Sequence, residues 1–465
     1  MADLDTGSDF VAGTAVVASA MNTRFTNIET WANGSPNIGV AGSTTTMDGA
    51  LTVTQALQNN STVTVGVDDT GYDVQMFGAT SGSYLLWDES ANALILTNAD
   101  FVPSTPTGRR NLIINGSMYI IQASTEGRAV TYTYGTGSGT RHYPVERFWT
   151  GNYRWSAGTD ITVSRDATVF PTGHTQSYKV TSSGTGLTFS SGGYLTIEYT
   201  VEAQDIAPYY AETAMTLSFW CRSTDTGIFN VMFANEWWGT GSADRGLSKE
   251  FTISSADTWE HKTITFDLAA GTASGTWAVG SGIGLTIEWV LGAHADRTGD
   301  EYLDTWATWS GYEVCTDSNI QLMTGANSNF YLTGVQLEVG GQATPFENRP
   351  YVDELTACKR YYQVYDTAAS NYPLAAGVLL NTTTANCVLH YEKSMRAAPT
   401  IVVPSVDEFD VITGGGTQAS TNVTFSGTTL FATQINITAS SLTAGQGTLF
   451  RGDGGEIILK AEMLQ

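Results

Sequence analysis

The sequence is poor in charged residues, and above all in basic ones. Only 14% of its 465 residues are charged, against about 25% in an average soluble domain. Lysine and arginine number 21 against 45 acidic residues, so the formal net charge is −24, and no basic residue lies between Arg24 and Arg109. Nucleic-acid binding requires cations that neutralise phosphates, and anionic membranes attract basic segments. The charge balance therefore argues against both kinds of partner.

Cysteines are few and long apolar runs are missing. The cysteines lie far apart and form no C-x-x-C pair, so the sequence supports neither a zinc ribbon nor a redox motif; they are Cys221, Cys315, Cys358 and Cys387. We expect four reduced, mostly buried thiols. No apolar run reaches the roughly 18 residues that a membrane-spanning helix needs, and the acidic start of the chain lacks a signal-peptide pattern. We therefore expect synthesis in a reducing cytoplasm and no membrane insertion.

Motifs that carry catalysis are also missing. The sequence contains no G-x-S-x-G, H-E-x-x-H, Walker A or G-x-G-x-x-G pattern, and its five histidines lie far apart. We therefore assign no catalytic residue, no metal ligand and no cofactor. The two carboxylates of a glycoside hydrolase are paired in space and cannot be read from spacing. An enzyme that depolymerises a surface polysaccharide therefore remains an alternative.

Glycine-rich turns and short alternating strands dominate what is present. With 49 glycines and 42% hydrophobic residues, the chain is typical of a turn-rich, mostly β protein with a real core. In residues 109–350 we predict strands at Ile161–Ser164, Tyr178–Thr181, Leu195–Val201, Met215–Cys221, Ile228–Ala234, Lys249–Ile253, His261–Leu268, Gly284–Leu291 and Phe330–Val339. Such a series without convincing helices predicts a β-sandwich. We expect Trp220, inside the apolar run Met215–Cys221, to belong to its core.

The remaining chain divides into three segments. Residues 1–34 contain apolar residues at helical spacing between Val11 and Trp31. Residues 35–108 hold only short strands, such as Tyr84–Trp87 and Ala93–Leu96, which give a poor core to a single chain. Residues 351–465 contain a short helix and a smaller β-domain. We therefore predict a helical N-terminal segment (1–34), a β-rich shaft (35–108), a central sandwich (109–350) and a C-terminal β-domain (351–465).

The boundary between the last two segments has its own pattern. An alternating strand from Phe330 to Val339 is followed by Gly340, Gly341, Pro345 and Pro350, which end a sheet. Beyond Pro350, Leu355, Cys358 and Tyr362 fall on one side of a predicted short helix.

This boundary also carries a resemblance to a known family. The sequence reads Q-L-E-V-G from Gln336, A-T-P-F-E from Ala343, R-P from Arg349 and C-x-R-Y-Y from Cys358. Upstream, N-L-I-I-N-G begins at Asn111 and E-R-F-W at Glu146. In this order the motifs resemble tail fibres and related virion proteins of aquatic bacteriophages, over residues 109–365. The resemblance implies a jelly-roll sandwich, like that of a carbohydrate-binding module, carried on a fibre or spike.

The resemblance and the core-poor shaft together suggest how the chain assembles. Three parallel copies would bury the short strands of residues 35–108 better than one copy can, so we expect a homotrimer. We expect residues 1–34 to dock on other virion proteins of the tail or adaptor, and residues 109–465 to point outward. A decoration fibre on the head or collar is a second placement.

Loops of the central domain supply candidate glycan contacts. Sugars stack their C–H faces on aromatic rings and need carboxylate or amide partners for their hydroxyls. Residues 235–241 place two tryptophans side by side, and residues 300–309 interleave three aromatics with three acids. We predict that Trp238, Trp306 and Trp309 are exposed stacking surfaces and that Asp300 and Asp304 accept hydroxyl protons, although such rings are more often buried. The favoured function is host-glycan recognition by a virion fibre.

Overall fold

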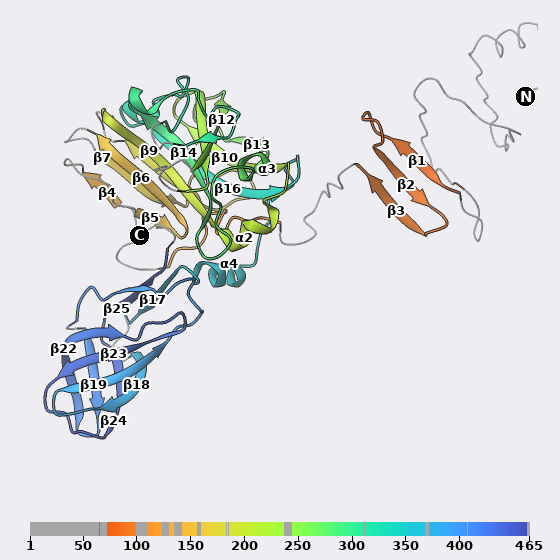
Figure 1. Ribbon diagram of the computed structural model, residues 1–465. Helices are drawn as coiled ribbons and strands as arrows, with labels where there is room; N and C mark the ends of the chain where they lie inside the picture. Colours follow the sequence, from red (N-terminus) through yellow and green to blue (C-terminus); the bar gives the residue numbers. More distant parts are fainter. Residues whose placement is uncertain are drawn as a thin grey trace, which may run out of the picture. The chain divides into compact units, whose positions relative to one another are not determined.

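The computed structural model describes residues 65, 72–98, 110–122, 130–133, 142–155, 160–182, 184, 186–236, 244–309, 313–367, 372–406 and 408–462. For residues 130–133, 142, 152–155 and 160 only the backbone is described. The predicted N-terminal helix lies outside these residues. The chain forms two compact units, Met1–Ala99 and Asp100–Gln465, and strands dominate both (Figure 1). The mostly-β prediction is therefore confirmed.

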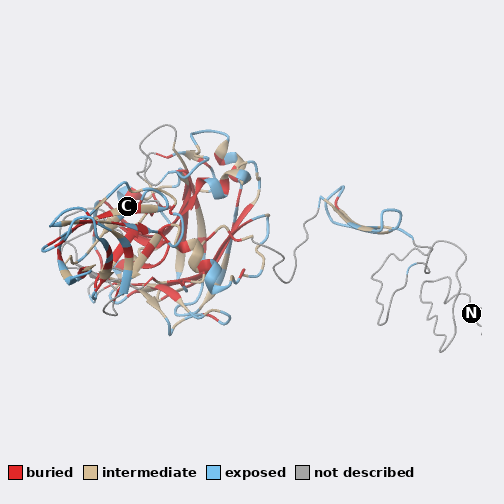
Figure 2. Cartoon of the chain, turned by 90° about the horizontal axis from the view of Figure 1, so that it is seen from below, coloured by how far each residue is buried: buried red, intermediate tan, exposed pale blue. Residues whose placement is uncertain are grey.

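The first unit contains one antiparallel three-stranded sheet. Its strands are β1 (Val74–Phe77), β2 (Tyr84–Asp88) and β3 (Ala93–Thr97). The register places six apolar residues on one face, because directly opposed residues share a face: Val74, Met76, Leu85, Trp87, Leu94 and Leu96. Of residues 72–98 only Ser83 is buried, as the tan and pale blue of this sheet show (Figure 2). Within the described part of this unit, the apolar face is therefore not covered.

The larger unit begins with a sandwich of two antiparallel sheets. The six-stranded sheet has the order β13-β10-β16-β8-β7-β4. Its strands are β4 (Val130–Thr133), β7 (Asp160–Asp166), β8 (Ser177–Ser182), β10 (Met215–Ser223), β13 (Glu260–Phe266) and β16 (Asn329–Val339). The seven-stranded sheet has the order β15-β12-β11-β14-β9-β6-β5. Its strands are β5 (His142–Val145), β6 (Phe148–Trp155), β9 (Phe189–Glu202), β11 (Gly227–Ala234), β12 (Arg245–Ile253), β14 (Ile283–Ala293) and β15 (Ala307–Thr308). All nine strands predicted for this region are present.

Alternation along the strands builds the shared core between the two sheets. In β9, the side chains of Leu195, Ile197, Tyr199 and Val201 enter the core, while the residues between them point to the outer face of the sheet. Phe148, Phe219 and Trp289 from three other strands fill the centre and contact one another edge-on or at a tilt. These three side chains are almost completely buried.

Trp220 is not part of this core, which corrects the prediction. In β10 the residues Met215, Leu217, Phe219 and Cys221 face inward. Because side chains alternate along a strand, Trp220 lies on the outer face of the six-stranded sheet, where it is partly exposed. The alternation of Thr216 and Ser218 with Met215, Leu217 and Phe219 indicates the same outward face for Trp220, and the prediction overlooked it.

Short helices lie in the loops of the sandwich and in its connection to the C-terminal part. They are α2 (Ala203–Ile206), η1 (Ala207–Tyr209), α3 (Leu268–Thr272), η2 (Ala295–Arg297), η3 (Leu322–Thr324) and α4 (Tyr351–Cys358). Helix α4 is the predicted one, but it ends at Cys358, and Tyr362 begins a strand. The expectation that Tyr362 lies on the helix is therefore wrong. No helix among the described residues has the length and apolarity needed to cross a membrane.

The C-terminal part combines a three-stranded sheet with a closed barrel (Figure 1). The sheet has the order β17-β25-β20, with β17 (Tyr362–Asp366), β20 (Thr400–Val402) and β25 (Glu456–Lys460). The barrel has the order β18-β19-β23-β22-β21-β24. Its strands are β18 (Tyr372–Leu379), β19 (Thr384–His390), β21 (Phe409–Thr413), β22 (Gly416–Ser426), β23 (Ala432–Ala439) and β24 (Gly447–Gly452). All four cysteines are buried and free, as expected.

A buried group of charges joins the sandwich to the C-terminal part; we call it the junction. Arg147, which follows β5, pairs with Glu462 beyond β25 and lies 3.6 Å above the ring of Tyr361. Glu202 at the end of β9 accepts hydrogen bonds from the guanidinium of Arg360 at 3.0 and 3.2 Å and from the Tyr361 hydroxyl at 2.8 Å. Removing one partner from such a buried pair costs several kcal/mol, because the other charge is left uncompensated.

Glu146 lies at the same junction and forms no ion pair within the described part of the chain, although the charge of Arg147 opposes the rise of its pKa. Its carboxylate accepts the backbone N–H of Gln122 at 3.0 Å. Burial, and next the nearby carboxylate of Glu462, raise the pKa of Glu146 to about 8. The folded protein thus holds this proton more tightly than the unfolded chain. The stabilisation is fully present below the ordinary glutamate pKa near 4.5 and is lost as pH rises toward 8.

We therefore predict that Glu146→Gln makes stability less dependent on pH. The amide keeps an acceptor for Gln122 and imitates the protonated acid. Thermal unfolding should show the variant a few degrees more stable than the wild type at pH 9, with the difference vanishing or reversing at pH 5. Glu408→Gln, which removes an exposed carboxylate, is the matched control. An unchanged pH profile in Glu146→Gln would contradict the assignment.

Candidate functional site

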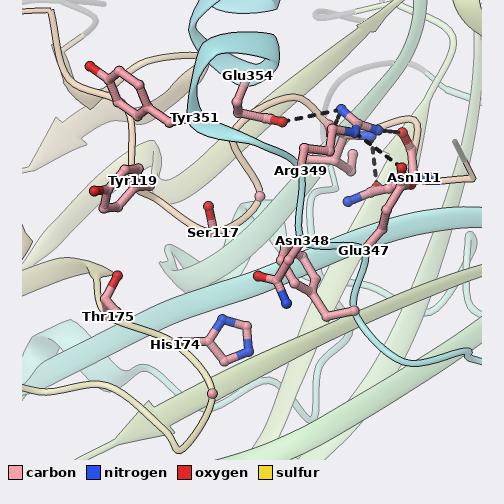
Figure 3. Close-up of a pocket in the computed structure, with 14 residues that line it drawn as sticks. Asn111, Ser117, Tyr119, His174, Thr175, Glu347, Asn348, Arg349, Tyr351 and Glu354 are labelled. Atoms are coloured by element: carbon pink, nitrogen blue, oxygen red, sulfur yellow. Dashed lines mark hydrogen bonds and ion pairs between the residues drawn. The ribbon is translucent and has the colours of Figure 1, made fainter. Parts of the chain in front are cut away.

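A cavity of about 290 Å³ opens beside the junction, where three distant segments meet (Figure 3). They are the N-L-I-I-N-G segment with Tyr119, the loop 173–175 before β8, and residues 346–354 around the start of α4. We call this cavity the pocket. Its lining combines aromatic rings with amide, hydroxyl and imidazole groups, the composition of a small-molecule site.

The N-L-I-I-N-G segment is fixed along β16 by Asn111. The Asn111 side chain donates to the carbonyl of Val335 at 3.0 Å and accepts the backbone N–H of Leu337 at 3.0 Å. A Cβ at Gly116 would lie 2.0 Å from the Val335 carbonyl oxygen, so only glycine allows this approach. The motif that resembles the phage proteins is therefore a structural element, and it forms one wall of the pocket.

Glu347, Arg349 and Glu354 hold the same segment from the other side. Glu347 accepts the backbone N–H groups of Arg110 and Asn111 at 2.8 and 2.7 Å. Arg349 donates to the carbonyls of Asn111 and Ile113, and Glu354 accepts the backbone N–H of Asn115. Figure 3 shows the contacts of Arg349 with Asn111 and with the Glu354 carboxylate, which lies 3.6 Å from the guanidinium. Both carboxylates are thus engaged by backbone donors.

A β-bulge in β16 brings His174 against the sheet. Gly334 and Val335 together oppose the single residue Phe219 of β10, and Gly334 has a φ of +61°, a conformation that glycine adopts without strain. A Cβ at Gly334 would lie 2.6 Å from Cε1 of His174. The imidazole also packs on Phe346, with ring centroids 5.2 Å apart.

His174 adds an imidazole to the polar groups of the pocket. Its Nδ1 is buried and has no partner among the described residues. Burial, followed by the nearby His261, lowers the pKa of the His174 imidazole below its ordinary value of 6.5. At neutral pH the ring is therefore uncharged, with one nitrogen able to accept and the other to donate.

Two exposed tyrosines form the opposite rim. The rings of Tyr119 and Tyr351 lie 5.5 Å apart and are perpendicular to each other, and Figure 3 shows both on the side of the pocket away from Arg349. Tyr119 is 45% exposed and Tyr351 54% exposed. Large aromatic side chains are usually more buried than this, and their open faces suit stacking against an apolar ligand face.

The residues predicted from the sequence lie elsewhere, and two of them are buried. Trp306 donates its indole N–H to the Asp267 carbonyl, and Trp309 donates its own to the Glu313 carbonyl. Trp309 packs on Met232 across the outer face of the seven-stranded sheet. The expected exposure of these two rings is therefore wrong. Trp306 belongs to the main core of the sandwich, where it contacts Phe266 and Trp277, and Trp309 covers part of the outer face of the seven-stranded sheet.

The other residues predicted to contact a glycan are placed differently. Asp300 and Asp304 are exposed; Asp300 accepts the backbone N–H of Asp317, and Asp304 pairs with Lys249 at 2.7 Å. Trp238 lies outside the described residues. Glycan binding by this loop stays a prediction. No three His, Cys, Asp or Glu side chains in the described part of the chain are grouped to hold a metal ion.

A pair of buried carboxylates lies on the outer face of the seven-stranded sheet. Glu198 of β9 and Glu288 of β14 are directly opposite each other. Burial, and next the charge of Glu198, raise the pKa of Glu288 well above its ordinary value, so Glu288 keeps its proton to a higher pH than an exposed glutamate does. They are only 1% and 3% exposed, and a substrate could not reach them without rearrangement.

Sequence reasoning missed the pocket because its walls come from residues far apart in the chain. Tyr119, His174 and Tyr351 are separated by more than 50 residues each, and no spacing rule joins them. The one signal was the pair of motifs around Asn111 and Arg349, which the resemblance identified without showing that they touch.

Comparisons with known proteins give distant structural similarities only. No protein-family model matches the chain, and no curated protein matches it. A putative sugar binding protein from Bacteroides thetaiotaomicron is 10% identical, with a TM-score of 0.28, over 50% of this chain and 100% of that one. A family 11 carbohydrate-binding module from Clostridium thermocellum, in complex with a β-1,3-1,4-mixed-linked tetrasaccharide, is 13% identical, with a TM-score of 0.24, over 47% and 99%. A family 30 module from the same organism is 11% identical, with a TM-score of 0.25, over 46% and 99%. Because these TM-scores are low, no ligand is transferred to this chain.

The protonation state of the pocket provides a direct test. We predict that His174 titrates below pH 6.5, because burial and the neighbouring His261 disfavour the charged ring. Histidine-selective NMR through a pH series would measure the value, with His174→Gln used to assign the signal. In His261→Gln the titration of His174 should shift upward. A titration of His174 above 6.5 would mean that the imidazole is charged near neutral pH.

Proposed function

We propose that this chain is a virion fibre subunit that recognises a glycan on the host surface, and that the pocket binds one sugar of that glycan. The observation that carries the proposal is the pair of exposed, perpendicular tyrosines facing a neutral imidazole across the pocket. A sugar ring presents C–H groups on its faces and hydroxyls around its edge. One tyrosine can stack on such a face while the other closes the side.

The polar groups of the pocket suit the edge of a sugar. His174 can accept or donate, and the exposed Asn348 amide and Thr175 hydroxyl provide further donors and acceptors around it. A neutral hydroxyl-rich ligand needs such groups and no charge. The net charge of −24 further disfavours acidic polysaccharides, since like charges repel over the distances at which ligands approach.

Binding is favoured over catalysis at this pocket because its carboxylates are already engaged. Glu347 and Glu354 each accept backbone hydrogen bonds and thereby hold the wall in place. The second candidate function, a polysaccharide depolymerase, draws on the Glu198–Glu288 pair, because glycosidases use two neighbouring carboxyl groups of which one, the general acid, has a raised pKa. The burial of both carboxyl groups favours a structural role for this pair.

Assembly and placement complete the proposal. The sheet β1-β2-β3 has an apolar face that nothing described in its unit covers, and a three-stranded sheet needs a covered face for stability. Packing three copies in parallel would cover it. The virion role follows the resemblance of residues 109–365 to phage fibre proteins, with residues 1–34 docking on the tail and the larger unit facing the host.

We predict that Tyr351→Ala and Tyr119→Ala each weaken glycan binding by roughly tenfold or more, because each removes one stacking face. The full-length protein would be screened on an array of neutral and acidic saccharides, and affinities for the best neutral sugar would be measured by calorimetry. Tyr372→Ala is the matched control, since Tyr372 is 51% exposed on the barrel strand β18.

Several outcomes would contradict this assignment. Binding lost in Asp300→Ala and Asp304→Ala but retained in both tyrosine variants would place the ligand on the loop predicted from the sequence. Release of shorter saccharides by the wild type, abolished in Glu288→Gln, would support the depolymerase. Absence of binding to every saccharide would exclude glycan recognition.

For assembly, we predict that deleting residues 1–34 leaves a folded trimer that no longer enters virions. Light scattering would give the mass of both proteins in solution, and complementation of a phage lacking the gene would measure incorporation. A monomeric full-length protein at micromolar concentration would contradict the trimer. Particles that still contain the truncated protein would contradict the docking role.

A further inference from the structure

We infer that the pocket is one end of a longer binding surface, and that a neutral oligosaccharide continues from it over Trp220 and His261 on the outer face of the six-stranded sheet. This inference rests on the proposed glycan-binding function and extends it from one sugar to a chain of several. We call the surface formed by Trp220 and His261 the shelf.

The bulge in β16 makes the pocket and the shelf continuous. A Cβ placed on Gly334 would lie 2.6 Å from Cε1 of His174 and 3.0 Å from Cδ1 of Trp220. The imidazole of the pocket and the indole of the shelf therefore meet over the same glycine. Because that position carries no side chain, nothing of residue 334 projects between them.

The sheet register provides a second connection. His261 of β13, Trp220 of β10 and Thr333 of β16 are directly opposed and form one row across the outer face. The Thr333 hydroxyl donates to the carbonyl of Ser117 at 3.4 Å, and Ser117 lines the pocket. The row thus runs from the edge strand of the sheet to the pocket wall.

The shelf has the open aromatic surface that a sugar needs. The rings of Trp220 and His261 lie 5.2 Å apart and are tilted by 53°; His261 is exposed and Trp220 partly exposed. The Trp220 indole N–H has no hydrogen-bond partner within the described part of the chain, so it is able to donate to a hydroxyl. Burial lowers the pKa of His261, which leaves that ring uncharged at neutral pH as well.

The neighbouring row on the same face differs and supplies a control. Tyr331 is 7% exposed, and its ring is flanked by Lys179 and Arg222, which pair with Asp166 and Asp257. Trp259 contacts the edge of Tyr331 with centroids 6.1 Å apart. That row is covered by its own ion pairs, whereas Trp220 is partly exposed and His261 is exposed in the row beside it.

The test compares saccharides of increasing length, from one to four units of the neutral sugar that binds best on the array. For the wild type we expect affinity by calorimetry to rise by roughly tenfold between the single sugar and the longer chains, the increment of one further stacking contact. In Trp220→Ala and His261→Ala, measured at pH 8 so that His174 is neutral in every variant, the single sugar should bind as in the wild type, while the gain with length is lost. Trp259→Ala should retain that gain.

The outcomes separate this inference from the proposed function. If the single sugar binds and Tyr351→Ala abolishes it, but affinity does not rise with length or rises equally in Trp220→Ala and His261→Ala, the shelf is wrong and the pocket stands. If no neutral saccharide binds the wild type, both are wrong. The thermal unfolding temperature of each variant will show whether the variant is folded. His261→Ala alters only an exposed side chain.

Discussion

The larger unit depends on buried polar groups that complete hydrogen bonds where the sheets end. Glu202, 1% exposed at the end of β9, accepts bonds from Arg360 and Tyr361, which follow α4. Buried charges are tolerated only when they are paired and hydrogen-bonded. This requirement fixes the direction in which the chain leaves the sandwich. The same requirement makes the residues of the sequence motifs, from Glu146-Arg147 to Arg360-Tyr361, neighbours in space although they are far apart in the chain.

The walls of the pocket are held rigid by similar hydrogen bonds from buried polar groups. Asn111, Glu347 and Arg349 each bind backbone groups of another segment, so the walls are held by hydrogen bonds rather than by loop packing alone. Binding sites whose supporting residues are fixed in this way lose less entropy when a ligand arrives. The polar network therefore serves stability at the junction and preorganisation in the pocket at once.

The strands were largely predictable from the sequence, and the faces of those strands were less so. Alternation in Leu195–Val201 marked β9 and its inner residues correctly. The strand β5 was not predicted, because its sequence, His142-Tyr-Pro-Val145, lacks a clear alternation and contains a proline. In Met215–Cys221 the polar residues Thr216 and Ser218 mark the outer face, and a period of two places Trp220 on that face with them. The prediction was wrong because it followed the hydrophobicity of Trp220 instead of this alternation.

The tryptophans show why composition alone misplaced the candidate site. The sequence of an acidic, aromatic-rich loop does not show whether the loop binds a ligand or covers a sheet. Trp306 enters the core of the sandwich, whereas Trp309 of the same loop covers part of the outer face of the seven-stranded sheet. Val314 and Cys315 of the adjoining segment pack on Tyr194 and Val290 of that face. That face is thus filled by the chain itself. On the six-stranded sheet, residues 116–117 cover Thr333 and the loop 173–175 reaches only as far as Gly334, which leaves Trp220 partly exposed and His261 exposed in the described structure. An open aromatic row bordered by a rigid pocket is the place where a glycan can replace water without displacing protein.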